Sequence, residues 1–254
     1  MKPINTNDHE LLIDSLQNES LVFLDGFHAV KHALRFNADI QLIVCTHPQK
    51  LDNLIADYAP DVESAILEKC KIARTNVVDA LRRTRSHWTG VYGVAIRPEY
   101  ELNKILNAPG NIVLLENPYN FGNLGACIRT AAAAQAAGVI LINGVSPWEP
   151  PAIRGAAGLQ FAVPVVSTKL DDLLRTSRKI IALDPQGSPI SQFDFTDDLI
   201  FAFGTEREGL SDELKRLSAI TLGLPMQAGV SSMNLATSVG IVLYAAVLRN
   251  EGCR

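Results

Sequence analysis

Four short apolar runs in the second half of the chain constrain its fold most strongly. They are VLLE, VILI, IIAL and LIFAF, and each is followed directly by asparagine, aspartate or glycine. Runs that are apolar at almost every position, and not only at alternate ones, are typical of parallel strands covered on both faces. The segment LGACIRTAAAAQAAG has the composition of a covering helix. We therefore predict an α/β domain with a parallel sheet over residues 111–254.

The first part of the chain alternates helical and strand-like segments. HELLIDSLQN and GFHAVKHALRF have apolar positions at helical spacing, whereas IQLIVCT and GVYGVAIRP are typical of strands. This alternation predicts a small α/β sandwich over residues 1–100. Residues 101–110, which end in Pro109 and Gly110, are predicted to link the two domains.

The composition is that of a globular protein. The chain has 254 residues, of which 47% are hydrophobic and 20% charged. No apolar run reaches the roughly 20 residues of a membrane span, and the segment MKPINTNDHE lacks the pattern of a signal peptide, so we expect a cytoplasmic protein. Four cysteines without a CxxC pair indicate neither a zinc site nor a disulfide framework.

Bulk charge does not indicate a nucleic-acid partner, since the formal net charge is -4. One local exception lies in residues 69–87, where Asp79 is the single acid. The basic residues and histidine of this stretch are Lys69, Lys71, Arg74, Arg82, Arg83, Arg85 and His87. The stretch is either a solvated helix face or a contact with nucleic-acid phosphates.

Ligands of parallel sheets bind beyond the carboxyl ends of the strands, which directs attention to loops 116–125, 204–211 and 224–234. The first loop contains no GxGxxG pattern, so it does not favour a dinucleotide site. Its Asn123 either caps the following helix or contacts a ligand. Arg129, within that helix, either forms a salt bridge or directs its guanidinium at a phosphate or ribose.

The other two loops carry further candidates. Gly204 ends a buried run, Glu206 follows it, and Ser211 is placed to cap the next helix. The third loop, LPMQAGVSSMN, precedes an apolar helix with more small and polar residues than one helix cap requires. Its backbone groups are therefore candidates for binding a ligand.

Together, the three loops resemble the three motifs of the SpoU (TrmH) class of SPOUT RNA methyltransferases. In this chain the segment that resembles the first motif is GNLGACIR, with Asn123, Gly125 and Arg129. The segments that resemble the second and third motifs are FGTEREGLS and PMQAGVSSMN. The resemblance covers roughly residues 111–250. It implies a parallel-sheet domain with a deep trefoil knot, preceded here by a small RNA-binding domain that GFHAVKHAL and RSHWTGVYGVAI resemble.

The resemblance also implies a cofactor and a set of site residues. S-adenosylmethionine would be bound, largely through backbone groups, by Gly204, Thr205, Leu224, Pro225, Ser232 and Met233. The implied catalytic residue is Arg129, with Asn123, Glu206, Ser232 and Asn234 positioning it, the hydroxyl or the cofactor. The RNA-binding candidates are Arg82, Arg83, Arg85 and His87. No metal is required.

The implied reaction moves a methyl group from the sulfonium to a ribose 2′-hydroxyl of RNA. Two roles stay open for Arg129: a proton acceptor, or a group that holds the target phosphate and ribose. The family is dimeric, and the apolar segment IVLYAAVL fits either a homodimer surface or core packing.

Three functional hypotheses follow. The first is an RNA 2′-O-ribose methyltransferase, acting on ribosomal RNA in preference to transfer RNA. The second is a non-catalytic RNA-binding relative that assists RNA assembly. The third, a nucleotide-dependent oxidoreductase, is disfavoured because GxGxxG is missing. The sequence leaves open the nucleotide modified, the role of the first 20 residues, and whether the RNA is recognised alone or in an assembling ribosome.

Overall fold

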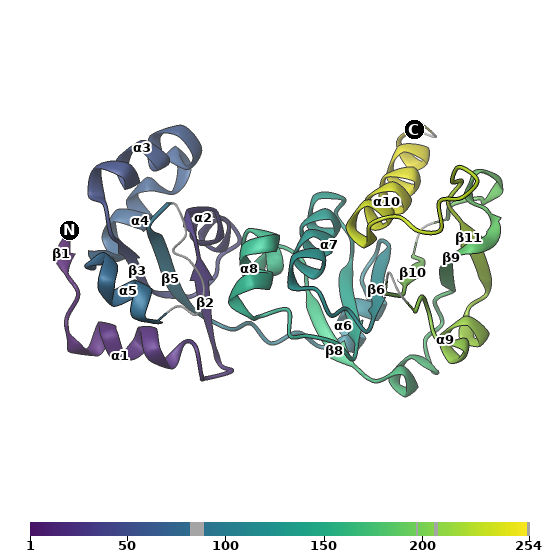
Figure 1. Cartoon of the computed structure of the whole chain (residues 1–254), viewed down its shortest axis with the longest axis horizontal. Coiled ribbons are helices and arrows are strands. Elements are labelled where there is room, and N and C mark those ends of the chain that lie inside the picture. The colour runs from purple at the N-terminus through teal and green to yellow at the C-terminus, as the bar shows by residue number, and fades with distance from the viewer. Residues whose placement is uncertain (82–88, 197, 206–207, 253–254) are drawn as a thin grey trace. The chain divides into compact units, whose positions relative to one another are not determined.

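The computed structural model of the chain describes residues 1–81, 89–196, 198–205 and 208–252. These residues pack as two units (Figure 1). The first unit comprises Met1–Glu99 together with Trp148–Ala162, and the second comprises Tyr100–Pro147 together with Val163–Arg254. The segment Trp148–Ala162 thus departs from the boundaries expected from sequence, because it packs with the first unit although it lies within residues 111–254.

The second unit is built on a six-stranded sheet in the order β11-β9-β10-β6-β7-β8. Every neighbouring pair in it is parallel. The strands are β6 (Ile112–Glu116), β7 (Gly138–Ile142), β8 (Val165–Thr168), β9 (Ile180–Pro189), β10 (Ile200–Phe203) and β11 (Ile220–Gly223). The four apolar runs form β6, β7, β9 and β10, so the prediction of a parallel sheet is confirmed.

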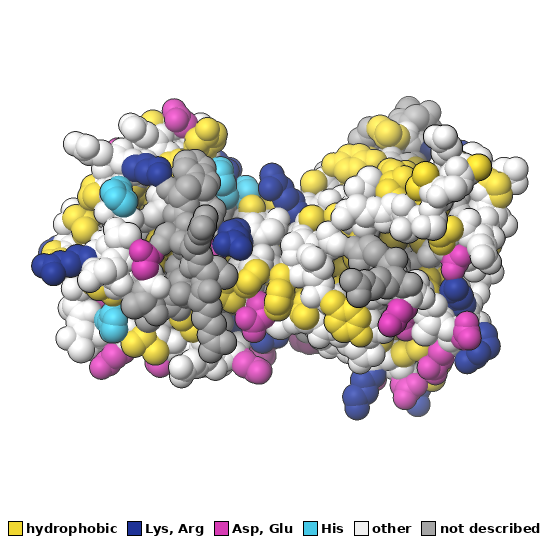
Figure 2. Space-filling model, in the orientation of Figure 1, with side chains coloured by type: hydrophobic (Ala, Val, Ile, Leu, Met, Phe, Trp, Pro, Cys, Tyr) yellow, Lys and Arg dark blue, Asp and Glu magenta, His cyan; other side chains and the backbone are white. Residues whose placement is uncertain are grey.

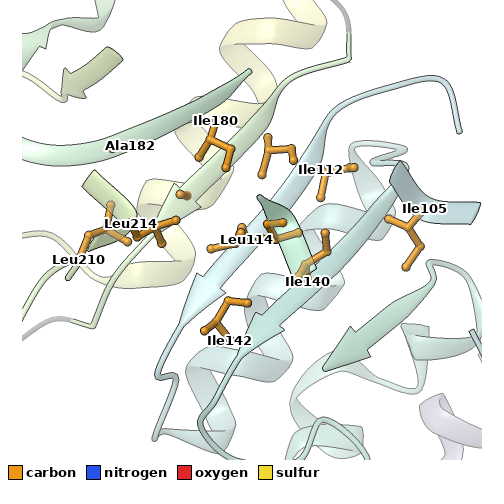
Figure 3. Packing of buried hydrophobic residues seen from close by; sticks show 12 residues of the cluster. Ile105, Ile112, Leu114, Ile140, Ile142, Ile180, Ala182, Leu210 and Leu214 are labelled. Carbon is orange, nitrogen blue, oxygen red and sulfur yellow. The ribbon is translucent and has the colours of Figure 1, made fainter. Parts of the chain in front are cut away.

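Helices cover both faces of this sheet, as the continuous apolar runs require. They are α6 (Leu102–Asn107), α7 (Phe121–Ala133), α9 (Asp212–Leu217) and α10 (Leu235–Gly252), with the 3-10 turns η3 (Leu170–Leu173) and η4 (Ile190–Gln192). On one face, Leu114 and Ile140 join Ile105 of α6 and Leu214 of α9 in a buried cluster (Figure 3). Helices α7 and α10 pack against each other and contact β7 and β10.

The first unit contains a five-stranded sheet of mixed direction, in the order β1-β4-β3-β5-β2. Strand β5 (Val91–Ile96) pairs antiparallel with β2 (Leu21–Asp25) and β3 (Ile40–Cys45). Strand β4 (Cys70–Ile72) runs parallel to β3 and to β1 (Lys2–Pro3). The helices are α1 (Thr6–Asp14), α2 (Phe27–Arg35), α3 (Pro48–Tyr58), η1 (Pro60–Val62), α4 (Glu63–Lys69), α5 (Thr75–Leu81), α8 (Pro150–Ala156) and η2 (Leu159–Phe161).

Polar contacts attach the segment Trp148–Ala162 to the rest of the first unit. The guanidinium of Arg154 lies 3.4 Å from the buried carboxylate of Asp25 at the end of β2. The Nδ1 atom of His32 on α2 lies 2.8 Å from the carbonyl oxygen of Ala157. Since a carbonyl only accepts, Nδ1 carries the proton. These partners are more than 120 residues apart in sequence, which is why no local pattern predicted them.

Within the part of the chain that the structure describes, no helix is both long and apolar enough to cross a membrane.

Candidate active site

A cavity of about 250 Å³ lies in the second unit, where the middle of β9 and the carboxyl ends of β10 and β11 meet the start of α10. Parallel strands bring their carboxyl ends to one edge of a sheet, and ligand sites form there. The lining residues are Leu183, Asp184, Pro185, Phe203, Gly204, Thr205, Glu208, Gly209, Leu222, Leu224, Met226, Ser231, Ser232, Met233, Leu235 and Ser238.

Most of the residues expected to bind a cofactor lie on the wall of this one cavity. They are Gly204, Thr205, Leu224, Ser232 and Met233; Pro225 is not among the lining residues. Thus the second and third sequence motifs, separated by α9 and β11, meet at a single site.

The backbone after β10 explains the glycine at position 204. A Cβ atom there would collide with the backbone of Gly209 and Leu210. The loop is closed by a hydrogen bond from the Gly209 N–H to the Thr205 carbonyl, 3.0 Å long. Gly209 itself has a φ of +67°, a conformation that side chains disfavour. This fold-back holds backbone groups of the second motif against the cavity.

A buried carboxylate fixes the far end of the same loop. Glu116, at the end of β6, accepts hydrogen bonds from the Ser211 N–H at 2.7 Å and the Ser211 hydroxyl at 2.6 Å. The Ser211 Oγ in turn accepts the Leu214 N–H at 3.2 Å, which confirms the predicted cap of α9. Because the two oxygens of Glu116 are both used, β6 and the second motif are held together by a charge-assisted pair.

The first and third motifs are joined by an amide–amide hydrogen bond. The Nδ2 of Asn234 donates to the Oδ1 of Asn123 at 3.0 Å. The Oδ1 of Asn234 accepts the Thr237 N–H at 3.2 Å, so Asn234 caps α10. The cap of α7 is Asn120, whose Oδ1 accepts the Asn123 N–H. The interpretation of Asn123 as a helix cap is therefore wrong, and its side chain faces the third motif instead.

Arg129 is exposed on α7 and does not line the cavity. Among the described residues Arg129 forms no ion pair, so the salt bridge considered for it is not found there. Five of the predicted site residues lie outside the described residues: Glu206, Arg82, Arg83, Arg85 and His87.

Three residues that border the cavity, Leu183, Asp184 and Pro185, were not predicted from sequence. They lie in the middle of β9, where its register with β11 shifts. The carboxylate of Asp184 lies 2.6 Å from the Lys215 Nζ and accepts the Gln186 N–H at 2.9 Å. The hydrogen bond from Lys215, and then that from Gln186, hold the pKa of the Asp184 carboxyl below its usual range. The sequence does carry a signal for these residues, because the segment DPQG follows the apolar run IIAL as the other site segments follow theirs.

The charged side chains in the lining are carboxylates. Asp184 and Glu208 line the cavity, and no lysine or arginine is among its described lining residues. Phosphate groups are normally bound by arginine, lysine or a helix N-terminus. The charge of this wall therefore favours a ligand that carries a positive centre.

Comparison with known proteins gives a consistent result. The model of the SpoU rRNA Methylase family matches residues 110–244. The 23S rRNA (adenosine(1067)-2′-O)-methyltransferase of Streptomyces laurentii is 30% identical over 169 residues, and the match spans only 63% of this chain and 63% of that enzyme. The 23S rRNA (guanosine-2′-O-)-methyltransferase RlmB of Acinetobacter baylyi is 31% identical over 176 residues, covering 62% of this chain and 70% of that enzyme.

A solved structure shows the same fold over nearly the whole chain. It is the SpoU methyltransferase AviRb from Streptomyces viridochromogenes in complex with the cofactor AdoMet. Its TM-score is 0.79 at 20% identity, covering 98% of this chain and 100% of that one. At this identity the likeness concerns the fold. The family match covers more than half of the chain and contains all three motifs, so the chain belongs to the SpoU rRNA methylase family.

Proposed function

We propose that this protein transfers a methyl group from S-adenosylmethionine to a ribose 2′-hydroxyl of RNA, with ribosomal RNA the preferred substrate. One observation carries the proposal: the second and third motifs line one cavity, and Asn123 of the first motif is hydrogen bonded to Asn234 of the third. The names of the two relatives, both 23S rRNA 2′-O-methyltransferases, support ribosomal RNA as the substrate class. With such a substrate we also propose a cytoplasmic location.

The lining residues fit S-adenosylmethionine. The cavity combines apolar side chains with backbone exposed at Gly204 and Gly209, and its charged groups are carboxylates. When bound, the cofactor supplies an electrophilic methyl group on a cationic sulfur. Gly204, Thr205, Leu224, Ser232 and Met233 would hold it.

The residues of the first and third motifs act on the RNA. Arg129, exposed on α7, holds the phosphate and ribose of the target nucleotide, so that the hydroxyl is oriented for in-line attack. Asn123 and Asn234, which are hydrogen bonded to each other, fix the start of α7 against the start of α10. Ser232 on the cavity wall, and Glu206, complete the proposed positioning groups.

We further infer that the C-terminal segment forms the trefoil knot of the family and that the protein is a homodimer. One face of α10 is buried, through Val239, Val242, Leu243 and Ala246. Its other face exposes Ile241, Tyr244 and Leu248, and hydrophobic side chains gather there (Figure 2). Core packing accounts for the first face, and a second copy of the chain would cover the other.

The first unit is proposed to bind RNA. Its candidate residues Arg82, Arg83 and Arg85 suit phosphate contacts, which weaken as salt rises. Replacing the three with alanine is expected to lower RNA affinity and flatten its salt dependence. An unchanged slope would show that RNA binds elsewhere.

The decisive experiment is transfer of labelled methyl from S-adenosylmethionine to ribosomal and transfer RNA isolated from a host lacking this gene. The products are digested and examined for 2′-O-methylnucleosides. We expect label in ribosomal RNA, lost on Arg129→Ala while cofactor affinity changes less than about tenfold, roughly 1.4 kcal/mol. Arg175→Ala, at another exposed position of the second unit, is the control. Cofactor binding without transfer to either RNA would contradict the proposed substrates, and absence of cofactor binding would favour a non-catalytic RNA-binding role.

A further inference from the structure

We propose that the carboxylate of Asp184 makes the cavity select the cationic methyl donor over its neutral demethylated product. This inference rests on the proposed function and deepens it. It assigns a role to a residue outside the three motifs, in the middle of β9.

The position of Asp184 places a negative charge beside the ligand and its counter-ion further away. The side chain is 17% exposed and borders the cavity. Lys215, its ion-pair partner, belongs to α9 and is not a lining residue. A ligand in the cavity can therefore contact the carboxylate directly, whereas the ammonium lies on the other side of the ion pair and outside the lining.

The carboxylate is held in one orientation. One oxygen accepts from Lys215 and the other from the Gln186 N–H. Both interactions favour its charged form, which agrees with the lowered pKa of the group. The charge is thus present throughout the neutral pH range and does not depend on the ligand to form.

The rest of the wall does not cancel this charge. Glu208 adds a second carboxylate from the loop after β10, and no described lining residue is a lysine or arginine. Inside a partly enclosed cavity, a charge acts on a ligand more strongly than in water. Methyl transfer removes the positive charge from sulfur, so the donor is attracted to this wall and the product is not. The difference favours exchange of product for fresh donor after each turnover.

Three ligands separate this role from ordinary contacts. The donor and its product, S-adenosylhomocysteine, share the adenosine, the ribose hydroxyls and the amino-acid group, and differ by the methyl group and the sulfonium charge. Sinefungin carries an ammonium-bearing carbon in place of the sulfonium, so it tests charge without a transferable methyl. If Asp184 contacted a shared group, a substitution would weaken all three ligands alike.

The experiment is calorimetric titration of the full-length protein with each of the three ligands. Asp184→Asn is expected to weaken S-adenosylmethionine and sinefungin about tenfold more than S-adenosylhomocysteine. Lys215→Met is expected to act in the opposite direction, raising the preference for the two cations, because it leaves the carboxylate unpaired. Asp171→Asn, which removes the same charge from an exposed residue outside the cavity lining, is expected to change no ratio.

The outcomes are distinct. Equal weakening of all three ligands by Asp184→Asn, or a lower preference for cations in Lys215→Met, would overturn the inference while leaving the proposed function intact. Failure of the unaltered protein to bind S-adenosylmethionine would overturn both. The Lys215 variant keeps the test open if Asp184→Asn does not fold.

Discussion

The two sheets of this protein differ in strand direction, and so in where their connecting loops lie. In the second unit all six strands are parallel, and the middle of β9 and the loops after β10 and β11 converge on one cavity. In the first unit β5 runs against β2 and β3, so successive loops leave from opposite edges. A parallel sheet gathers residues that are far apart in sequence, whereas a mixed sheet disperses them.

The ion pairs and buried hydrogen bonds of the two units also differ in what they hold in place. In the second unit, Glu116 and Asp184 anchor the two ends of α9 and thereby the loops of the cavity. In the first unit, Lys71 pairs with Asp8 to attach α1 to β4, and Arg154 pairs with Asp25 to attach the segment Trp148–Ala162. Polar anchors thus shape a ligand site in one unit and hold peripheral segments in the other.

Arg178 should be the most costly anchor of the second unit to remove. Its side chain, 6% exposed, donates to the carbonyls of Leu106 in the last turn of α6 and of Ala108 and Gly110 after it. Arg178→Met leaves these carbonyls without their donor, and we expect a loss of roughly 3–4 kcal/mol in the free energy of unfolding.

This loss is measured by urea denaturation followed by circular dichroism. Lys104→Met, which removes an exposed ion pair with Glu101, should cost less than about 0.5 kcal/mol. Similar costs for Arg178 and Lys104 would contradict the distinction between buried and surface anchors.

Gly204→Ala tests the fold-back of the second motif. Its new Cβ would press on the backbone of Gly209 and Leu210, at a cost of about 3 kcal/mol, and S-adenosylmethionine affinity should fall at least about a hundredfold. Gly209→Ala is the control, because no described atom lies within 4 Å of its added Cβ and only the positive φ costs about 1 kcal/mol. Titration of both variants with the cofactor measures the difference, and equal effects would refute the steric argument.

Glu116→Gln should have a smaller effect. The amide keeps the volume but loses the charge that accepts two hydrogen bonds from Ser211, so we expect a cost of about 2 kcal/mol. Cofactor affinity should fall and amide exchange should rise in residues 208–214. Glu149→Gln, at an exposed position of the first unit, should change neither. Unaltered exchange in Glu116→Gln would show that the pair does not hold the loop.

The smallest expected effect is a pH dependence confined to the first unit. Burial, together with the neighbouring charges of Lys31 and Arg35, lowers the pKa of His32, although the bond to Ala157 opposes this. Between the lowered pKa and the unfolded value of about 6.5, the unfolded chain binds more protons. Stability should therefore fall, by less than about 1 kcal/mol, as pH drops below 6.5, since the ring is only partly buried.

Tryptophan fluorescence can follow this effect, because the two tryptophans, at positions 88 and 148, lie within the residue ranges of the first unit. His32→Gln keeps a donor for Ala157 but does not titrate, so its fluorescence-detected stability should be flat between pH 7 and 5.5. A slope that persists in this variant would assign the pH dependence to another group.

Sequence alone determined the parallel sheet, its strands β6, β7, β9 and β10, and the cap at Ser211, because burial on both faces and helix capping leave local patterns. It also determined the family, through three motifs read in order. The tertiary structure alone decided that Asp184 borders the cavity, that Asn120 and not Asn123 caps α7, and that Trp148–Ala162 packs with the first unit. Hydrophobic periodicity reports whether a residue is buried and says nothing of its partner. Contacts such as Glu116 with Ser211, 95 residues apart, depend on strand order and register, which only the folded chain fixes.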